Sequence, residues 1–407
     1  MRLSYVYDCG AMDSYAKERD REIRRYLSRA RPAKRRLDIL FLSHVHADHV
    51  NGVPILLAKK GGVKVDTIVL PLVDVVDRLI AFARTLSADA ASAHDAFYQR
   101  FVVDPVAAIS DFGPRQIIFL KRGNDGGAPG ADEGPLPRLD GPDVGGPWHH
   151  ETGPSWKLVG HGNVEEVGPS DPKVQGPRQY VVPDTAAIGI FATSAKGVEP
   201  AAWLLAPYVD TAVVATRSAF VTRLARRLKI KVSLIEDWLK ITSNLQMLVT
   251  TGLSHLSAAY SAITPNFNIT SLSLYSGPAR GLTIALPRGR RGLFGLVSGI
   301  TALPAWLGTG DAALKERKRR NAFVSHYGSL LTEVGTLLLP HHGSDHNFHH
   351  DLLLAVNPSV CIASADKYSN WKHPGPHTVQ AVCSHPAVIQ VVTSKPRSRA
   401  HEVAFVG

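Results

Sequence analysis

The chain has 407 residues, of which 44% are hydrophobic and 20% are charged, and its formal net charge is +11. This composition predicts a compact α/β protein, built as one large domain with insertions or as two domains. Cys9, Cys361 and Cys383 are too few and too far apart for a disulfide framework or a thiolate zinc cluster, so a bound metal would need imidazole and carboxylate ligands.

The N-terminal segment has no pattern of a secretory signal, because Asp8 and Asp13 interrupt it. The longest apolar-rich stretch, residues 292–308, contains polar residues and a proline and is too short to cross a bilayer. We therefore expect a cytoplasmic protein without a membrane partner.

Strands and helices are predicted to alternate in the first hundred residues. Residues 3–7 read as a strand, 14–29 as a polar helix and 37–43 as a near-continuous apolar strand buried on both faces of a sheet. Helical patterns follow at 50–60 and at 72–101, where a break is expected near Ser87, and residues 66–70 form a strand between them. This order is typical of an α/β fold.

The middle of the chain changes in character. Residues 122–183 are rich in glycine and proline, and we expect 123–176 to be an inserted loop or linker that is partly disordered. Residues 217–263 read as two or three amphipathic helices. Strands are predicted to return at 269–275, at 282–286, in a short segment that reaches Leu307, and at 336–340, 359–364 and 388–393.

Basic residues gather in three stripes. Ten lie between Lys17 and Arg36, six between Arg217 and Lys231, and five between Lys315 and Arg320. Such stripes favour binding of a polyanion, because each cation that meets a phosphate releases a counterion. Solvated basic helix faces explain each single stripe equally well.

The segment His44-Val-His-Ala-Asp-His49 is the strongest chemical signal in the sequence. Four candidate ligands, His44, His46, Asp48 and His49, fall within six residues directly after a buried strand. Imidazole and carboxylate bind borderline and hard divalent cations, and a loop lets side chains one and two positions apart converge. The alternative is a histidine-rich surface loop, but a polar cluster against a buried strand is costly without a cation.

Two later segments place candidate ligands after strands in the same way. Asp311 follows Gly308-Thr-Gly310, which lets a carboxylate approach a cation, although Asp311 is also a suitable helix N-cap. His341 and His342 follow the strand predicted at 336–340.

These segments together resemble the metallo-β-lactamase superfamily. Residues 43–52 resemble its T/S-H-x-H-x-D-H signature, 268–274 an N-x-x-S-L strand, 307–311 a T-G-D turn, 339–344 an L-x-x-H-H-G-S turn and 370–376 an N-x-x-x-H-P element. The combination is similar to the hydrolase domain of ComEC-type competence proteins. The resemblance implies an αββα sandwich of two mixed sheets flanked by helices. It would form a single domain over residues 1–407, carrying 122–183 and 217–263 as insertions.

The resemblance also implies a centre of two zinc or manganese ions. His44 and His46 would bind the first ion, Asp48 and His49 the second, Asp311 would bridge them, and His342 or its neighbour His341 would complete the second site. The third histidine that many members give to the first ion has no clear counterpart, because His161 and His255 lie in unsuitable contexts. This implies a first site that is weaker or that favours manganese.

The implied chemistry is hydrolysis of a phosphodiester by metal-activated water, with Asp48 and His373 as the catalytic residues. His373 would bind the phosphate and protonate the leaving group, and Ser344 and Asn370 would lie beside it on the substrate. A structural turn before Pro374 is the competing explanation for His373.

We expect a nuclease or phosphodiesterase acting on nucleic acid. Relatives without a membrane channel suggest roles in genome maintenance or phage defence. The alternatives are a small-molecule metallo-hydrolase (a lactonase, a β-lactamase-like enzyme or a cyclic-nucleotide phosphodiesterase) and a non-catalytic nucleic-acid-binding module. Residues 217–263 would serve as a lid, a nucleic-acid clamp, a protein-partner surface or simple core packing.

Overall fold

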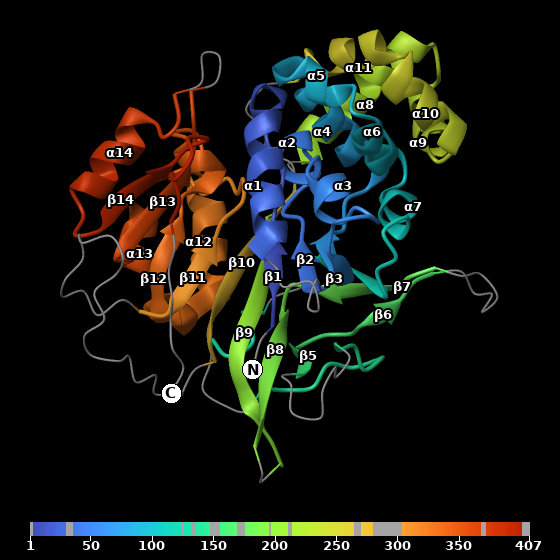
Figure 1. The fold of residues 1–407 in the computed structure, drawn as a ribbon. Coiled ribbons are helices and arrows are strands. Elements are labelled where there is room, and N and C mark those ends of the chain that lie inside the picture. Colours follow the sequence, from blue (N-terminus) through green and yellow to red (C-terminus); the bar gives the residue numbers. More distant parts are fainter. Residues whose placement is uncertain are drawn as a thin grey trace.

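The computed structural model of the protein has four layers, with two β-sheets packed face to face between two layers of helices (Figure 1). This arrangement confirms the predicted αββα sandwich of two mixed sheets. The residues that the structure describes are 3–29, 36–123, 126–131, 136–146, 155–168, 176–194, 197–210, 214–263, 270–279, 303–367 and 372–400.

The first sheet has the strand order β1-β2-β3-β4-β7-β6. Its strands are parallel except for the edge pair β6 and β7. The bounds are β1 (Tyr5–Tyr7), β2 (Arg36–Phe41), β3 (Lys64–Pro71), β4 (Gln116–Lys121), β6 (Glu165–Glu166) and β7 (Arg178–Pro183).

The outer face of this sheet is covered by the helices of the N-terminal part and of the 217–263 segment (Figure 1). Aspartates at 74, 95 and 104 cap α4, α6 and α7 by accepting hydrogen bonds from amides of the first turn. The bounds are α1 (Ala16–Arg29), α2 (Ala47–Val50), α3 (Val53–Leu56), α4 (Val75–Ala88), α5 (Ala90–Ala93), α6 (Ala96–Val103), α7 (Pro105–Ser110), α8 (Val214–Leu228), α9 (Ile235–Leu239), α10 (Thr242–Thr250) and α11 (Leu253–Tyr260).

The second sheet has the order β14-β13-β12-β11-β10-β9-β8-β5, in which β11 to β14 are parallel and the others antiparallel. Three helices, α12 (Arg317–Tyr327), α13 (Asp351–Val356) and α14 (Pro376–Cys383), pack on its outer face. The strand bounds are β5 (Ser155–Gly160), β8 (Ala186–Ser194), β9 (Gly197–Asp210), β10 (Ser271–Pro278), β11 (Ala305–Gly308), β12 (Val334–Leu338), β13 (Val360–Ser364) and β14 (Val388–Val392).

The two sheets share a hydrophobic interior. Ile39 and Phe41 of β2 and Leu272 and Leu274 of β10 belong to one buried cluster and are all at most 1% exposed. Because alternate residues of each strand point to opposite faces, the neighbouring residue Leu40 packs with the helices instead. This double burial explains why β2 reads as a continuous apolar run.

The structure differs from the sequence-based expectation in residues 122–183. The stretch expected to be a loop contains β5 and β6, and β7 lies within the Gly/Pro-rich insertion, so this segment contributes strands to both sheets. Trp156 of β5 is 3% exposed in the core between the sheets, which fixes this strand despite its glycine-rich surroundings. The helix expected at 50–60 is two short helices, α2 and α3.

The strands β4, β8 and β9 and the helix α7 have no counterpart in the predicted elements, whereas β10 to β14 confirm the later strands. The strand expected at 282–286 lies outside the described residues. Across the described ranges, no helix combines the length and the apolar character needed to span a membrane.

Candidate metal centre

The predicted ligands, together with Asp8, meet where parallel strands of both sheets end. Asp8 follows β1 and His44 follows β2, while Asp311 follows β11 and the two histidines at 341 and 342 follow β12. The Leu272 amide donates to the Ser43 carbonyl at 2.7 Å, and the Tyr7 hydroxyl donates to the Leu272 carbonyl at 2.6 Å. These bonds join the ends of β1 and β2 in the first sheet to the start of β10 in the second sheet. A site at the carboxyl edge of open sheets is expected in such a position.

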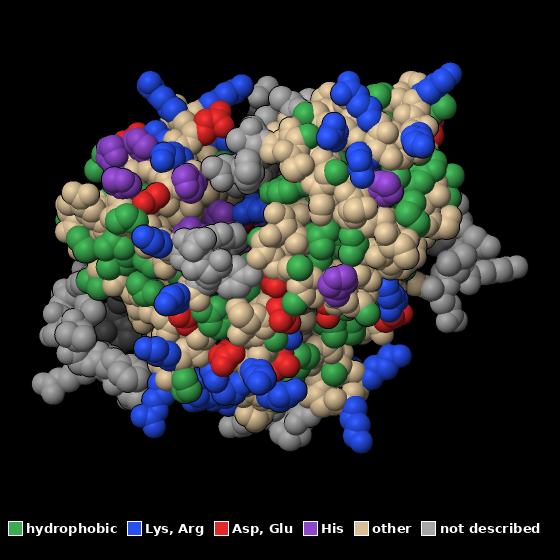
Figure 2. All heavy atoms as spheres, turned by 90° about the horizontal axis from the view of Figure 1, so that it is seen from above, with side chains coloured by type: hydrophobic (Ala, Val, Ile, Leu, Met, Phe, Trp, Pro, Cys, Tyr) green, Lys and Arg blue, Asp and Glu red, His purple; other side chains and the backbone are tan. Residues whose placement is uncertain are grey.

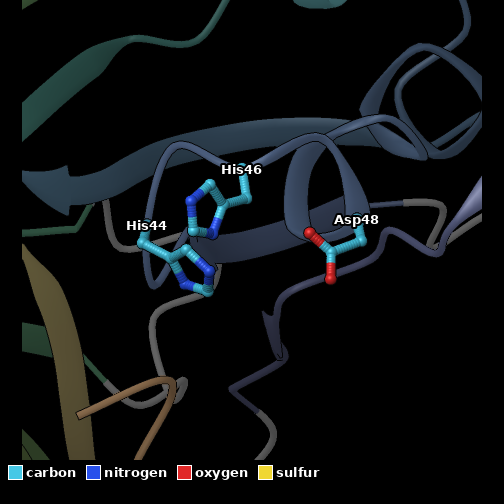
Figure 3. Close-up of side chains that lie close together, drawn as sticks. All are labelled: His44, His46 and Asp48. Atoms are coloured by element: carbon cyan, nitrogen blue, oxygen red, sulfur yellow. The ribbon is translucent and has the colours of Figure 1, made fainter. Parts of the chain in front are cut away.

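The loop after β2 brings together three of the candidates. His46 has extended backbone and directly precedes α2, so Asp48 lies on the first turn of that helix. Figure 3 shows the His44 and His46 rings close together on the loop and Asp48 on α2. One ligand atom from each of these three side chains lies within 4.8 Å of the others.

Asp311 lies between His44 and His49. Its Oδ2 atom is 3.4 Å from His44 Nε2, and its Oδ1 atom is 4.0 Å from His49 Nε2. Gly310 has a φ of +50°, a conformation that favours glycine, and the Asp311 amide donates to Ser271 Oγ at 3.0 Å. The T-G-D turn thus holds a buried carboxylate with its two oxygens directed toward different imidazoles.

His342 faces the other side of the loop. Its Nδ1–H donates to the Ser364 carbonyl at 2.8 Å, which leaves the Nε2 lone pair directed into the site. That Nε2 is 4.0 Å from Asp48 Oδ2, and His342, Asp48 and His49 form a second group of potential ligands within 4.8 Å.

His341 has a different environment from its neighbour. Its Nδ1 is 3.0 Å from Asn347 Oδ1, and its Nε2 is 3.2 Å from an Arg84 nitrogen and 3.6 Å from Asp311 Oδ2. His341 and His342 have φ values of +49° and +58°, which are uncommon for residues other than glycine. This left-handed turn sends the two imidazoles to different partners.

Several ligand-type atoms of this cluster are buried and have no hydrogen-bond partner among the residues that the structure describes: Nε2 of His44, His46 and His49, and Oδ1 of Asp311. A buried polar atom that lacks a partner costs about 1–3 kcal/mol, so this concentration is unfavourable unless a cation is present. Imidazole nitrogen and carboxylate oxygen are donors that divalent zinc and manganese accept. The residues therefore fit a metal centre.

Burial and charge set the protonation of the cluster. Burial lowers the pKa of His44 and lowers that of His46 well below its usual value, so both favour the neutral form that binds metals. Burial opposes charge on His49 as well, but the carboxylates of Asp48 and Asp8 outweigh it and raise the pKa of His49 to about 10. A bound cation would displace that proton.

The predicted substrate-binding residues have different outcomes. The His373 ring lies 5.6 Å from the His341 ring, centroid to centroid, and burial lowers the pKa of His373. Ser344 is 2% exposed, and its hydroxyl accepts a hydrogen bond from the His346 amide at 3.2 Å, within the same turn. Asn370 lies outside the described residues.

Sequence reasoning missed Asp8, Arg84 and Asn347. Asp8 Oδ2 is 2.8 Å from His49 Nδ1, and it accepts a hydrogen bond from Ser43 Oγ at 2.6 Å. A signal for Asp8 was present, because it directly follows a strand as His44 does. Gly10 lets the segment after Asp8 pack closely against α2, since a Cβ at Gly10 would lie 2.4 Å from the Asp48 backbone.

Residues 3–66 match the family model described as "Metallo-beta-lactamase superfamily". The matched segment contains the His44–His49 loop and Asp8 and ends before Asp311. Comparisons with curated proteins and with solved structures found no match. Members of this superfamily generally bind divalent metal ions, and the His/Asp clusters could hold them. The match and the clusters together support a metal-dependent hydrolase.

Proposed function

We propose that the protein is a phosphodiesterase that cleaves nucleic acid and uses two divalent cations, zinc or manganese. The observation that carries the proposal is the position of Asp311 between His44 and His49, with one carboxylate oxygen toward each. The first cation would be held by His44, His46 and Asp311, and the second by Asp48, His49, His342 and Asp311. When bound, the cations activate a water molecule and neutralise charge on the phosphodiester.

The residues around these ligands orient them. Asp8 accepts from His49 Nδ1, and the Ser364 carbonyl accepts from His342 Nδ1, so each ring presents Nε2 to the centre. Such partners fix the tautomer and raise the basicity of a ligating imidazole. His373, at the rim of the cluster, would donate a hydrogen bond to the substrate or its leaving oxygen.

The basic surface residues support a polyanionic substrate, although some of them form ion pairs with carboxylates of the same chain. Arg19 pairs with Asp20 at 2.7 Å, Arg319 with Asp210 at 2.9 Å and Arg320 with Asp351 at 2.7 Å. The stripes on α1 and α12 thus contribute to internal ion pairs as well as to the surface.

The stripe at the end of α8 is different. Its cations at 223, 226, 227, 229 and 231 are exposed, and within the described ranges no carboxylate lies at ion-pair distance from them. Exposed cations of this kind can meet phosphates. Together with the resemblance to the ComEC-type domain, they favour nucleic acid as the substrate.

A substrate screen tests this proposal. The purified protein, loaded with Mn²⁺ or Zn²⁺, would be incubated with bis(p-nitrophenyl) phosphate, plasmid DNA, single-stranded DNA, RNA, a lactone and a β-lactam. We expect cleavage of phosphodiesters that stops on chelation and in Asp311→Asn. Hydrolysis of the lactone or β-lactam alone would contradict the phosphodiester assignment. Phosphodiester cleavage that persists in chelated Asp311→Asn would contradict the metal mechanism.

A further inference from the structure

Arg84 on α4 lies beside the cluster and has an unusual environment. It is half-buried, and its only hydrogen-bond partner in the described part of the chain is His341 Nε2, at 3.2 Å. No carboxylate among the described residues lies at ion-pair distance from it. By contrast, the guanidinium of Arg115 contacts Asp66 at 3.0 Å, and that of Arg319 contacts Asp210 at 2.9 Å.

A chain of hydrogen bonds fixes the orientation of His341, the side chain that Arg84 contacts. The Asn347 amide nitrogen donates to the carbonyls of Asp311 and Ala312 at 3.0 and 3.3 Å, so its oxygen faces His341. His341 Nδ1 therefore carries the proton and donates to that oxygen, which leaves Nε2 as an acceptor for Arg84. This chain directs the guanidinium toward the cluster.

The charge of Arg84 acts on the same cluster. His341 Nε2, which Arg84 contacts at 3.2 Å, is itself 3.6 Å from Asp311 Oδ2. A fixed positive charge next to a cation site opposes cation binding. Such a placement becomes favourable when an anion lies between the guanidinium and the cations.

The chemistry of the guanidinium indicates which anion fits. Its planar fork of N–H donors matches the oxygens of a phosphate, and only one of its donors is engaged by His341. On the face seen in Figure 2, several histidine side chains lie near one another, with Lys and Arg side chains beside them. Arg84 itself is half-buried, so part of its side chain is accessible to an incoming phosphate group.

We propose that Arg84 binds a non-bridging oxygen of the substrate's phosphate group, with His341 as the residue that positions the guanidinium. The inference rests on the proposed function for the identity of the substrate. It adds a specificity-determining cation that lies outside the metal ligands. It also gives His341 a function distinct from that of His342.

The test uses Arg84→Gln, Arg84→Lys and a matched control, Arg100→Gln. Arg100 is an exposed arginine on α6 that forms an ion pair with Asp111. Asp111 lies shortly before the start of β4, so this pair is at the edge of the sheet opposite to the candidate metal centre. Bound metal, binding of inorganic phosphate to the metal-loaded protein by calorimetry, and kcat and KM on bis(p-nitrophenyl) phosphate would be measured. If Arg84→Gln does not fold, Arg84→Lys provides the comparison.

We expect Arg84→Gln to keep its metal and to weaken phosphate binding by about 10- to 100-fold, with a matching rise in KM. Arg84→Lys should lie between Arg84→Gln and the native protein, and Arg100→Gln should behave as the native protein. The inference would be overturned if phosphate binding is unchanged in Arg84→Gln, or if it weakens equally in Arg100→Gln. Loss of bound metal in Arg84→Gln would overturn it as well. If phosphate binding depends on Arg84 but no phosphodiester is cleaved, the inference holds and the proposed function fails.

Discussion

The loop at His44–His49 and the turn at Pro340–Gly343 both present histidines to one centre, but by different means. In the loop, the donors alternate with other residues, and extended backbone followed by α2 brings ligand atoms of His44, His46 and Asp48 within 4.8 Å of one another. In the turn, two adjacent histidines diverge because both have left-handed backbone. The partner of Nδ1 differs between these two histidines: His342 donates to the Ser364 carbonyl and its Nε2 faces Asp48, whereas His341 donates to Asn347 and its Nε2 contacts Arg84. We propose that this difference gives them separate roles.

The left-handed turn carries an energetic cost. Each residue other than glycine in this conformation costs about 1–2 kcal/mol. Backbone hydrogen bonds from His341 to the Gly310 carbonyl and from Ser344 to the His341 carbonyl hold the turn. Strain retained at this position is consistent with a functional turn.

The largest effect is expected at the residue that joins the two regions. Asp311→Asn keeps the shape of the side chain but removes the charge between His44 and His49, and we expect a loss of kcat/KM of about 10³-fold or more. Bound metal, measured by mass spectrometry of the native protein, should fall in parallel. Full activity with normal metal content would show that Asp311 does not bridge.

The two adjacent histidines should separate in a paired experiment. His342→Gln should lose about half of the bound metal and about 10²-fold in kcat, because it removes a ligand. His341→Gln should keep its metal and show a rise in KM of about 10-fold, because Arg84 loses its support. Equal metal loss in both variants would contradict the different roles assigned to them.

A smaller effect is expected behind the loop. Asp8→Asn weakens the acceptor that orients His49, and such partners typically change metal affinity by about 10- to 100-fold. Asp38→Asn is the matched control, because Asp38 accepts from the Ser4 amide near the opposite end of β2. Metal titration of both variants measures the difference. A similar metal affinity in Asp8→Asn and Asp38→Asn would remove Asp8 from the centre.

The smallest effect concerns the basic stripes. Arg227→Gln on α8 should weaken nucleic-acid binding by a few-fold and reduce the slope of log affinity against log salt by about 1, because one phosphate contact is lost. Arg319→Gln should instead lower the free energy of unfolding, since it leaves buried Asp210 without its ion pair. Unchanged salt dependence in Arg227→Gln would place the nucleic acid elsewhere.

Local patterns and strand ends made most of the centre predictable from the sequence. The four ligand candidates from His44 to His49 fall within six residues, and Asp311 and His342 come after strands that end at the same edge, so the cluster could be anticipated. Arg84 could not, because it lies on a regular helix and the turn that it contacts is more than 250 positions away. The strand β5 was missed because its pairing with β8 is non-local and its surroundings are rich in glycine.

The most direct test is anomalous diffraction from crystals of the native protein loaded with Mn²⁺ or Zn²⁺. We predict two ions that share Asp311, one within about 2.0–2.3 Å of His44 and His46 and the other within the same distance of His49 and His342. A single ion bound away from Asp311, or no ion between the loop and the turn, would contradict this prediction.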